Sequence, residues 1–331
     1  MHPVYEFGLN RMRLGSLLAG IVLFCRCADT GAPSAPLGYP SLTLCKLAVA
    51  CKLEKLVDTE PALADSLECF SDLVYKTAGS RALRLDLYRL KRSRSPLPVL
   101  VFIHGGAWKS GDKRDYSVYL LPFAAKGYVT VSVAYRFSRE APFPAAVQDV
   151  LGAVNWIKNH AEEYGMDAER IALIGGSAGG HLAMMAAYAA KAPLLHSECD
   201  GDPARLKVRA VVSIYGPSDL TTPVARENSA VVRFLGKTWD KAPELYAQAS
   251  PLFWIDGQDP ATLLFHGTLD ELVPVAQSDS LTARLQKAQV PVVYHRLRGW
   301  PHTMDLSQRV NDYCFYHMNA FFEKYLKQSG A

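Results

Sequence analysis

Hydrophobic residues from about residue 70 onward recur at spacings that distinguish strands from helices. Residues 83–90 ("LRLDLYRL") carry an apolar side chain at every second position, which predicts a strand with one buried face. Residues 99–103 ("VLVFI") are apolar throughout, as is typical of a strand covered on both sides. In residues 145–164 apolar side chains recur every three or four positions, so we expect a long amphipathic helix.

The rest of the chain continues this alternation of strands and helices. Apolar runs predict further strands at residues 129–135, 171–174, 208–215, 261–265 and 291–297. Further helices are expected at residues 178–190, 275–288 and 306–327. Residues 41–68 and 217–258 lack a regular period, so we expect irregular structure with short helical pieces there, the second stretch being a small insertion. This order of elements predicts an α/β fold with a mostly parallel central sheet and helices on both faces.

The N-terminal stretch has a different pattern. Two arginines precede an apolar run at residues 14–24, which is too short to span a bilayer comfortably but fits the apolar region of a secretory signal peptide. We therefore expect residues 1–35 to be a signal peptide and linker, and residues 36–331 to form one folded domain. On this interpretation the mature protein is secreted or periplasmic and has no stable membrane span. Lipid anchoring through Cys25 or Cys27 and a cytoplasmic location are the less favoured alternatives.

Charge and cysteine content exclude two classes of partner. The formal net charge is +4 over 331 residues, without a basic stripe carrying interleaved aromatic residues, so we expect no nucleic-acid partner. No pair of the seven cysteines has zinc-ligand spacing with histidines nearby, and we expect no metal or other cofactor. In an exported protein Cys45, Cys51 and Cys69 could form a disulfide, and buried free thiols are an equal alternative. The sequence does not indicate an oligomeric state.

A glycine-rich turn follows the predicted strand at residues 171–174. The stretch 171–181 reads "IALIGGSAGGH", so a Gly-x-Ser-x-Gly motif surrounds Ser177 and a helix begins at once. In such a turn the serine has a strained backbone, and its hydroxyl is presented at the carboxyl end of the sheet. The N-terminus of the following helix favours negative charge. Ser177 is therefore our candidate nucleophile.

A second glycine-rich loop, "FIHGGAW" at residues 102–108, follows another predicted strand. Acyl transfer requires hydrogen-bond donors aimed at the oxyanion of a tetrahedral intermediate. The backbone N–H groups of Gly105, Gly106 and Ala107 can supply them, together with that of Ala178, the residue after the serine. These four residues are our candidate oxyanion hole.

A serine hydroxyl becomes a good nucleophile only when a base takes its proton. Among the nine histidines, His302 lies in the loop after the last predicted strand, where a base should stand. Asp270 lies in the loop after the preceding strand and is our candidate for the acid that orients the imidazole. The chain order Ser177, Asp270, His302 is the one expected after a strand–turn–helix nucleophile. Glu271 and Asp219 are the alternatives for the acid.

Together these motifs resemble the α/β-hydrolase superfamily, and within it the serine carboxylesterases with a His-Gly-Gly loop. The resemblance runs from about residue 70 to residue 327, through "VFIHGGAW", "IALIGGSAGGHLA", "SIYGPSDL", "HGTLDELVP" and "GWPH". Within this group the chain is similar to the branch of acetylxylan and feruloyl esterases, and also to hormone-sensitive-lipase relatives. Ala107 stands where the latter have a third glycine.

The resemblance implies an eight-stranded sheet, a Ser-Asp-His triad and an acyl-enzyme intermediate formed from a small-molecule ester. Since no large lid is evident, we expect short acyl chains. We expect parts of 41–68, 108–118, 217–258 and 300–305 to line the substrate pocket, with Trp108 and Trp300 among the lining residues. Amide hydrolysis, as in arylformamidases or prolyl peptidases, is the alternative function.

Overall fold

The computed structural model describes residues 31–195 and 203–327. The chain divides into two units, Met1–Pro33 and Ser34–Ala331, and every helix and strand given below belongs to the second. The predicted signal segment at residues 14–24 and the cysteines at positions 25, 27 and 199 lie outside the described residues. The expected export of the protein therefore stays a prediction.

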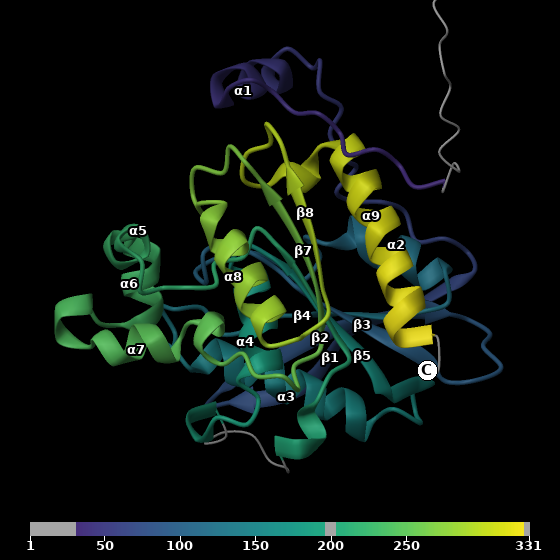
Figure 1. The fold of residues 1–331 in the computed structure, drawn as a ribbon. Coiled ribbons are helices and arrows are strands. Elements are labelled where there is room, and N and C mark those ends of the chain that lie inside the picture. The colour runs from purple at the N-terminus through teal and green to yellow at the C-terminus, as the bar shows by residue number, and fades with distance from the viewer. Residues whose placement is uncertain (1–30, 196–202, 328–331) are drawn as a thin grey trace, which may run out of the picture. The chain divides into compact units, whose positions relative to one another are not determined.

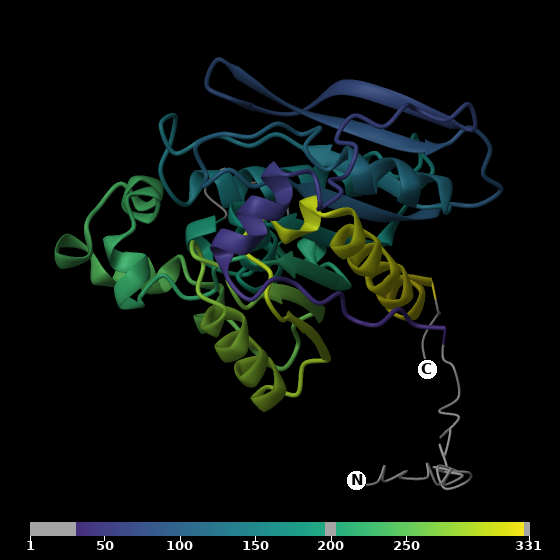
Figure 2. The same ribbon diagram turned by 90° about the horizontal axis from the view of Figure 1, so that it is seen from above.

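The centre of the second unit is an eight-stranded sheet with the order β1-β2-β4-β3-β5-β6-β7-β8 (Figures 1 and 2). The strands are β1 (Leu67–Ala78), β2 (Arg81–Leu90), β3 (Leu97–Ile103), β4 (Val129–Val133), β5 (Met166–Gly176), β6 (Ala210–Ile214), β7 (Ala261–Gly267) and β8 (Val292–Leu297). β2 pairs antiparallel with β1 and β4, and the pairs from β4 through β3 to β8 are all parallel. The carboxyl ends of the parallel strands therefore meet at one edge, where open sheets of this kind place their sites.

Helices cover both faces of the sheet (Figure 1). Alternate residues of β3 separate two cores: Val99, Val101 and Ile103 pack in one, and Leu100 and Phe102 in the other. The first core includes α3 (Ala145–Asn159), α4 (Ala178–Tyr188) and α8 (Ala276–Lys287), and the second includes α2 (Ser117–Ala125) and α9 (Gln308–Phe322). This arrangement confirms the predicted α/β class with a mostly parallel sheet.

Four further short α-helices lie in the described part. These are α1 (Leu42–Ala50), α5 (Pro223–Glu227), α6 (Ser229–Leu235) and α7 (Pro243–Gln248). The last three lie in the predicted insertion at residues 217–258, to the left of the sheet in Figure 1. No helix in the described ranges is both long and apolar enough to cross a membrane.

The four cysteines in the described ranges are free thiols. Cys45 and Cys314 are buried, Cys51 is exposed, and Cys69 is half-buried with its Sγ 3.2 Å from the Ser71 hydroxyl. Of the two alternatives left open by the sequence, the structure therefore favours free thiols over a disulfide among Cys45, Cys51 and Cys69.

Candidate active site

Ser177 stands at the sharp turn between β5 and α4. Its backbone has a φ of 54° and a ψ of −123°, a left-handed conformation that strains any residue with a side chain. The Ser177 amide donates to the carbonyl of Ile214 in β6 (2.9 Å), which ties the turn to the sheet. Gly179 allows close packing, since a Cβ there would overlap the carbonyl oxygen of Ile103 at the end of β3. The local structure is therefore the strand–turn–helix predicted from the sequence.

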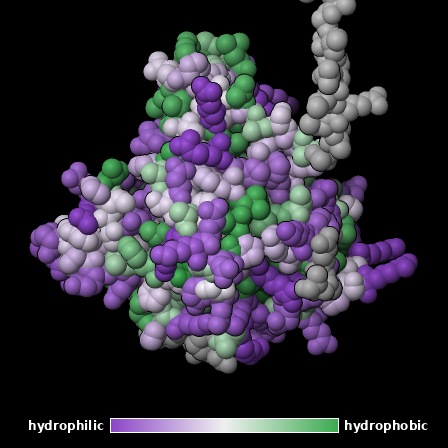
Figure 3. All heavy atoms as spheres, viewed as in Figure 1, coloured by the Kyte–Doolittle hydropathy of each residue, from purple (hydrophilic) through white to green (hydrophobic). Residues whose placement is uncertain are grey.

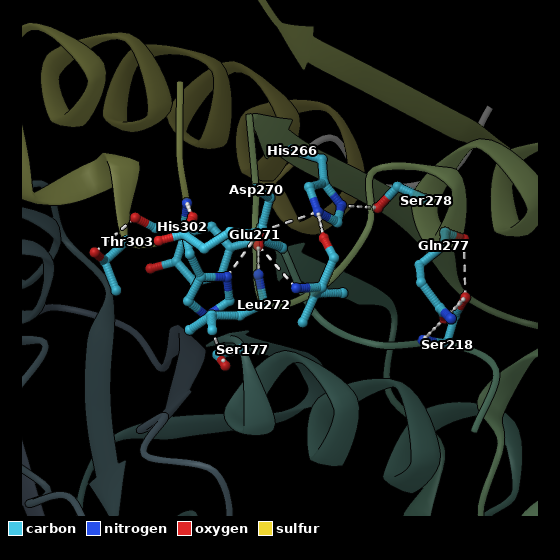
Figure 4. A network of polar contacts seen from close by, with 12 residues as sticks. Ser177, Ser218, His266, Asp270, Glu271, Leu272, Gln277, Ser278, His302 and Thr303 are labelled. Carbon is cyan, nitrogen blue, oxygen red and sulfur yellow. Dashed lines mark hydrogen bonds and ion pairs between the residues drawn. The ribbon is translucent and has the colours of Figure 1, made fainter. Parts of the chain in front are cut away.

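Three side chains from separate segments meet beside this turn (Figure 4). Nε2 of His302 lies 2.9 Å from Oγ of Ser177, and Nδ1 of His302 lies 2.7 Å from Oδ2 of Asp270. An ionised carboxylate can only accept hydrogen bonds, so Nδ1 of His302 donates to Asp270 and Nε2 accepts from the Ser177 hydroxyl. The structure thus brings the three predicted residues into one hydrogen-bonded chain.

Asp270 is held ionised by its surroundings. Its Oδ1 accepts from the amides of Leu272 (2.9 Å) and Val273 (2.8 Å), while Nε2 of His266 lies 3.2 Å from Oδ2. Burial alone would raise the pKa of Asp270, but the hydrogen bonds from His266, His302 and the backbone lower it to about 2. The carboxylate is therefore charged throughout the neutral range.

His266 is a site residue that was not predicted from the sequence. It is fully buried at the end of β7, and its Nε2 donates to the carbonyl of Val273 (2.9 Å) as well as facing Asp270. Its Nδ1 lies 2.7 Å from the Ser278 hydroxyl, which donates to it (Figure 4). The ring therefore links β7, the Asp270 loop and α8, and fixes where the carboxylate points.

The two alternative acids lie in other environments. Oε2 of Glu271 accepts from the backbone amide of His302 at 3.5 Å, and Oδ1 of Asp219 accepts from the amide (2.8 Å) and hydroxyl (2.6 Å) of Thr221. Within the described ranges neither carboxylate is hydrogen-bonded to the imidazole. The geometry therefore favours Asp270 as the partner of His302.

The loop after β3 faces the serine. Gly105, Gly106 and Ala107 line the same cleft as Ser177, and Gly106 and Ala107 have positive φ values of 101° and 53°. Ala178 is the first residue of α4, so its amide has no acceptor inside the helix. Within the described chain, the amides of Gly106, Ala107 and Ala178 donate to no backbone carbonyl. These N–H groups are therefore available to an anion beside Ser177.

The cleft at Ser177 has a volume of about 1020 Å³. Its rim includes charged side chains, namely Glu60, Lys109, Asp112, Arg114 and Asp115. Contrary to our expectation, none of the described residues that line it comes from 217–258, because that segment packs at the side of the sheet. Among the described residues, no group of three or more His, Cys, Asp or Glu side chains could hold a metal ion.

The expectation that Trp108 and Trp300 line the pocket is wrong. Trp108 is buried, stacks on Phe234 with ring centroids 4.5 Å apart, and donates from Nε1 to Nδ1 of His181 (3.3 Å). Trp300 is buried in the core on the other face of the sheet and donates from Nε1 to the carbonyl of Pro36 (2.8 Å). Both indoles therefore fix neighbouring segments, and neither is among the residues that line the cleft at Ser177.

A tyrosine and a buried acid support His302 from behind. The ring centroid of Tyr215 lies 4.4 Å from that of His302, and the Tyr215 hydroxyl donates to the carboxylate of Asp305. Asp305 is fully buried, and burial raises its pKa. Because Tyr215 and Asp305 are far apart in sequence and follow different elements, no sequence pattern predicts this pair.

The loop that carries His302 is also held by the N-terminal part of the second unit. The amides of Gly38 and Tyr39 donate to the carbonyls of residues 298 (3.0 Å) and 299 (2.8 Å), next to the bond from Trp300 to Pro36. This segment precedes β1 and contributes no side chain to the hydrogen-bonded chain at Ser177. It positions the histidine loop from outside.

A buried glutamate reinforces this connection. Glu54 accepts hydrogen bonds from Arg309 (2.6 Å), from the Ser307 hydroxyl (2.6 Å) and from the hydroxyl of Tyr39. Burial opposes ionisation of Glu54, but these hydrogen bonds and the charge of Arg309 lower its pKa to about 2. We refer to residues 36–57, which make these contacts, as the N-terminal strap.

Comparison with known families agrees with this geometry. The BD-FAE family model matches residues 85–285, which is more than half of the chain. The chain belongs to the BD-FAE family. The match includes the loop at 105–107, Ser177 and Asp270, but it ends before His302. The N-terminal strap also lies outside the part of the chain that defines this BD-FAE protein's family.

Curated relatives of the BD-FAE chain are esterases by name. It is 34% identical over 256 residues to Esterase LipC of Mycobacterium tuberculosis, covering 75% of this chain and 63% of that protein. It is 35% identical over 244 residues to the probable carboxylic ester hydrolase LipM of the same organism, covering 71% of this chain and 56% of that protein. The chain thus spans less than two thirds of the length of these relatives.

Solved structures with the same architecture include a truncated carbohydrate esterase from gut microbiota. The TM-score is 0.69 at 24% identity, over 80% of this chain and 99% of that one. At this level of identity the likeness concerns the fold alone. Together with the sheet order, it establishes the α/β-hydrolase fold of this BD-FAE protein.

Proposed function

We propose that this BD-FAE protein hydrolyses carboxylic esters through a covalent acyl-enzyme intermediate, with Ser177 as nucleophile, His302 as base and Asp270 as the orienting acid. The observation that carries the proposal is the hydrogen-bonded chain from Ser177 Oγ to His302 (2.9 Å) and from His302 to Asp270 (2.7 Å). The names of relatives such as LipC and LipM support ester hydrolysis as the reaction.

In the first half of the reaction, Oγ of Ser177 attacks the ester carbonyl carbon as Nε2 of His302 takes the hydroxyl proton. Asp270 stays ionised and stabilises the imidazolium that forms, consistent with its pKa of about 2. The carbonyl oxygen becomes an oxyanion. As the C–O bond breaks, His302 gives the proton to the departing alcohol and the acyl group remains on Ser177.

Backbone amides stabilise the oxyanion in this mechanism. The loop at residues 105–107 lines the cleft together with Ser177, and Ala178 is the next residue, at the N-terminus of α4. Preorganised donors of this kind do not need to reorient as charge develops, and each contributes about 3–4 kcal/mol to the transition state. Ala107 stands where some related esterases have a third glycine, and alanine keeps the same backbone N–H group.

In the second half, water replaces the alcohol. His302 takes a proton from the water, whose oxygen attacks the acyl carbon, and collapse of the second tetrahedral intermediate releases the carboxylic acid. Ser177 recovers its proton from His302, so the cycle closes without any other reactant. The cleft of about 1020 Å³ is large enough for a small-molecule ester and the attacking water.

We further propose short acyl groups as the preferred substrates. Residues 217–258, the segment that could form a lid, contribute no described residue to the cleft lining, and this supports an uncovered site. A panel of p-nitrophenyl esters of increasing acyl length tests this preference. A rate that rises steadily toward long acyl chains would contradict it.

The test of the reaction is the pair Ser177→Ala and Ser117→Ala, because both serines line the cleft but only Ser177 contacts His302. Ser117→Ala should retain turnover of p-nitrophenyl acetate and labelling by a fluorophosphonate probe. Ser177→Ala should lose both while its circular dichroism spectrum stays unchanged. Retained turnover in Ser177→Ala, or cleavage of N-formylkynurenine or aminoacyl-proline amides without ester turnover, would overturn the proposal.

A further inference from the structure

Helix α1 presents large apolar side chains to solvent. Leu44, Leu47 and Val49 in the helix, and Leu53 and Leu56 just after it, are all exposed, with Leu53 at 80% and Leu47 at 54%. Figure 3 shows hydrophobic surface at the top of the view, where Figure 1 places α1. We refer to residues 42–56 as the apolar ridge.

Exposure of this kind is unusual for a helix of this composition. The sequence of α1, "LTLCKLAVA", is apolar nearly all round, and a helix apolar all round is normally buried. Here only Cys45 and Ala48 are buried. Large contiguous apolar patches on a protein surface usually mark an interaction site.

The exposed charges of the ridge are all positive. Lys46, Lys52 and Lys55 are exposed, whereas the acid Glu54 is buried and paired with Arg309. Leucine side chains flanked by lysines are the combination with which amphipathic segments bind anionic lipid surfaces: the apolar groups enter the interface and the ammonium groups meet the headgroups. The charge pattern thus complements an anionic lipid surface, and a partner protein is an outcome that the test below distinguishes.

The ridge adjoins the candidate active site. An apolar groove of about 370 Å³ runs between α1 and the histidine loop, and residues such as Leu42, Val49 and Met304 line it. His302, Thr303 and Leu306 line both this groove and the cleft at Ser177. The ridge therefore lies within one side-chain layer of the reacting groups.

The ridge has a fixed position relative to the histidine loop. The Val57 amide donates to the carbonyl of Leu306 (2.9 Å), and the Gln308 amide donates to the carbonyl of Lys55 (2.8 Å). The ion pair between Glu54 and Arg309 adds a third link. A surface that contacts the ridge would therefore hold the cleft at a set distance.

We propose that the apolar ridge, residues 42–56, is a docking surface for anionic lipid interfaces, and that it holds the cleft beside esters dispersed in them. The second clause rests on the proposed ester hydrolysis, while the docking itself does not. The ligand class is an anionic lipid assembly, and the side chains that enter it are Leu44, Leu47, Leu53 and Leu56. Lys46, Lys52 and Lys55 supply the electrostatic attraction.

The experiment measures sedimentation of the full chain with vesicles of phosphatidylglycerol and phosphatidylcholine in equal parts, and with phosphatidylcholine alone. The Ser177→Ala background keeps any ester cleavage out of the binding measurement. The test variant is Leu47→Glu with Leu53→Glu. The matched control is Val224→Glu with Phe253→Glu, which changes two other exposed apolar side chains (57% and 51%) away from the ridge.

The wild-type ridge and the control should bind the anionic vesicles, more weakly at high salt and on phosphatidylcholine alone. The test variant should bind at least about tenfold more weakly. When Ser177 is left unchanged, the test variant should hydrolyse p-nitrophenyl acetate in solution at the wild-type rate, since neither Leu47 nor Leu53 lines the cleft. Equal vesicle binding by the test variant and the control, or no vesicle binding at all, would overturn the docking proposal.

Two further outcomes separate the hypotheses. If light scattering shows a concentration-dependent dimer that the test variant loses, and vesicles are not bound, the ridge is a self-association surface and the lipid proposal is wrong. If vesicles are bound but Ser177 gives no ester turnover, the docking stands and the proposed function fails. If the chain with an unmodified ridge binds no vesicles but shows full ester turnover, the docking proposal fails and the proposed function stands.

Discussion

Oδ2 of Asp270 lies 2.7 Å from Nδ1 of His302, inside a set of donors that includes two backbone amides. Asp270→Asn replaces a charged acceptor by an amide that can present a donor to Nδ1, and so favours the wrong tautomer of His302. We expect kcat for p-nitrophenyl acetate to fall about 10⁴-fold with little change in KM. Steady-state kinetics on the purified variant measure both constants.

The controls for this prediction are the two carboxylates that do not reach the imidazole. Glu271→Gln and Asp219→Asn should each keep kcat within about tenfold of the wild-type value, since a tenfold change corresponds to only 1.4 kcal/mol of barrier. A larger loss in Asp219→Asn than in Asp270→Asn would mean that the acid has been misassigned.

The N-terminal strap should make stability depend on pH through Glu54. Its pKa is lowered from 4.5 to about 2 in the folded protein, so its charged hydrogen bonds stabilise the fold above pH 4.5. This stabilisation is lost as the pH falls from 4.5 toward 2, because the unfolded chain takes up the proton first. Glu54→Gln should reduce the free energy of unfolding by about 1–2 kcal/mol at neutral pH and flatten its acid dependence.

Urea unfolding at a series of pH values measures this effect. Glu68→Gln is the control, because Glu68 forms an ion pair with Arg89 in which both side chains are partly exposed. It should leave most of the acid dependence in place. An unfolding free energy of Glu54→Gln that still falls as steeply as that of the wild type below pH 4.5 would refute the assignment to Glu54.

The close approach of α4 to β3 predicts a steric effect at Gly179. A methyl group there would overlap the carbonyl oxygen of Ile103, so Gly179→Ala should destabilise the fold by about 1–3 kcal/mol and displace the nucleophile turn. Gly152→Ala in the middle of α3 is the matched change, since its new methyl group would meet no backbone atom, only the side chain of Lys76 at 3.3 Å and the ring of Tyr75 at 3.8 Å. It should be neutral or stabilising by up to about 1 kcal/mol. Thermal unfolding of both variants distinguishes the two effects.

A buried carboxylate on α3 should be among the most sensitive positions outside the site. Asp149 is fully buried and accepts from Arg136 (2.8 Å) and Lys76 (2.9 Å), which come from different segments. Asp149→Ala leaves these cations with an uncompensated charge, so we expect a loss of about 3–5 kcal/mol. Arg296→Ala, which breaks an exposed pair with Asp279, should cost less than about 1 kcal/mol. Denaturant titration of both variants gives the comparison.

Strands with simple patterns were predictable, and elements with irregular patterns were not. The apolar run of β3 reflects its position between two cores, so its sequence alone indicated a central strand. β1 was not predicted because it is buried at irregular positions and has register shifts against β2. α2 was not predicted because its sequence, "SVYLLPFAA", is apolar nearly all round and contains Pro122. Neither β1 nor α2 has the regular spacing of apolar residues that indicates a strand or an amphipathic helix.

The site was predictable where a residue's position in the chain order determines its role. Ser177, Asp270 and His302 each follow a strand of the parallel sheet, so the topology alone brings them to one edge. The direction of a side chain is a different matter. Trp108 was expected in the pocket, but its indole stacks on Phe234 instead. Contacts across long separations, such as Tyr215 with Asp305, depend on packing that no local pattern records.

The bond from Trp300 to the carbonyl of Pro36 sets a limit on how far the chain can be shortened from its N-terminal end. An exopeptidase that digests inward meets the support of the histidine loop well before it meets any group of the candidate active site. Trimming beyond Pro36 would therefore remove one support of the histidine loop while Ser177 and Asp270 remain intact.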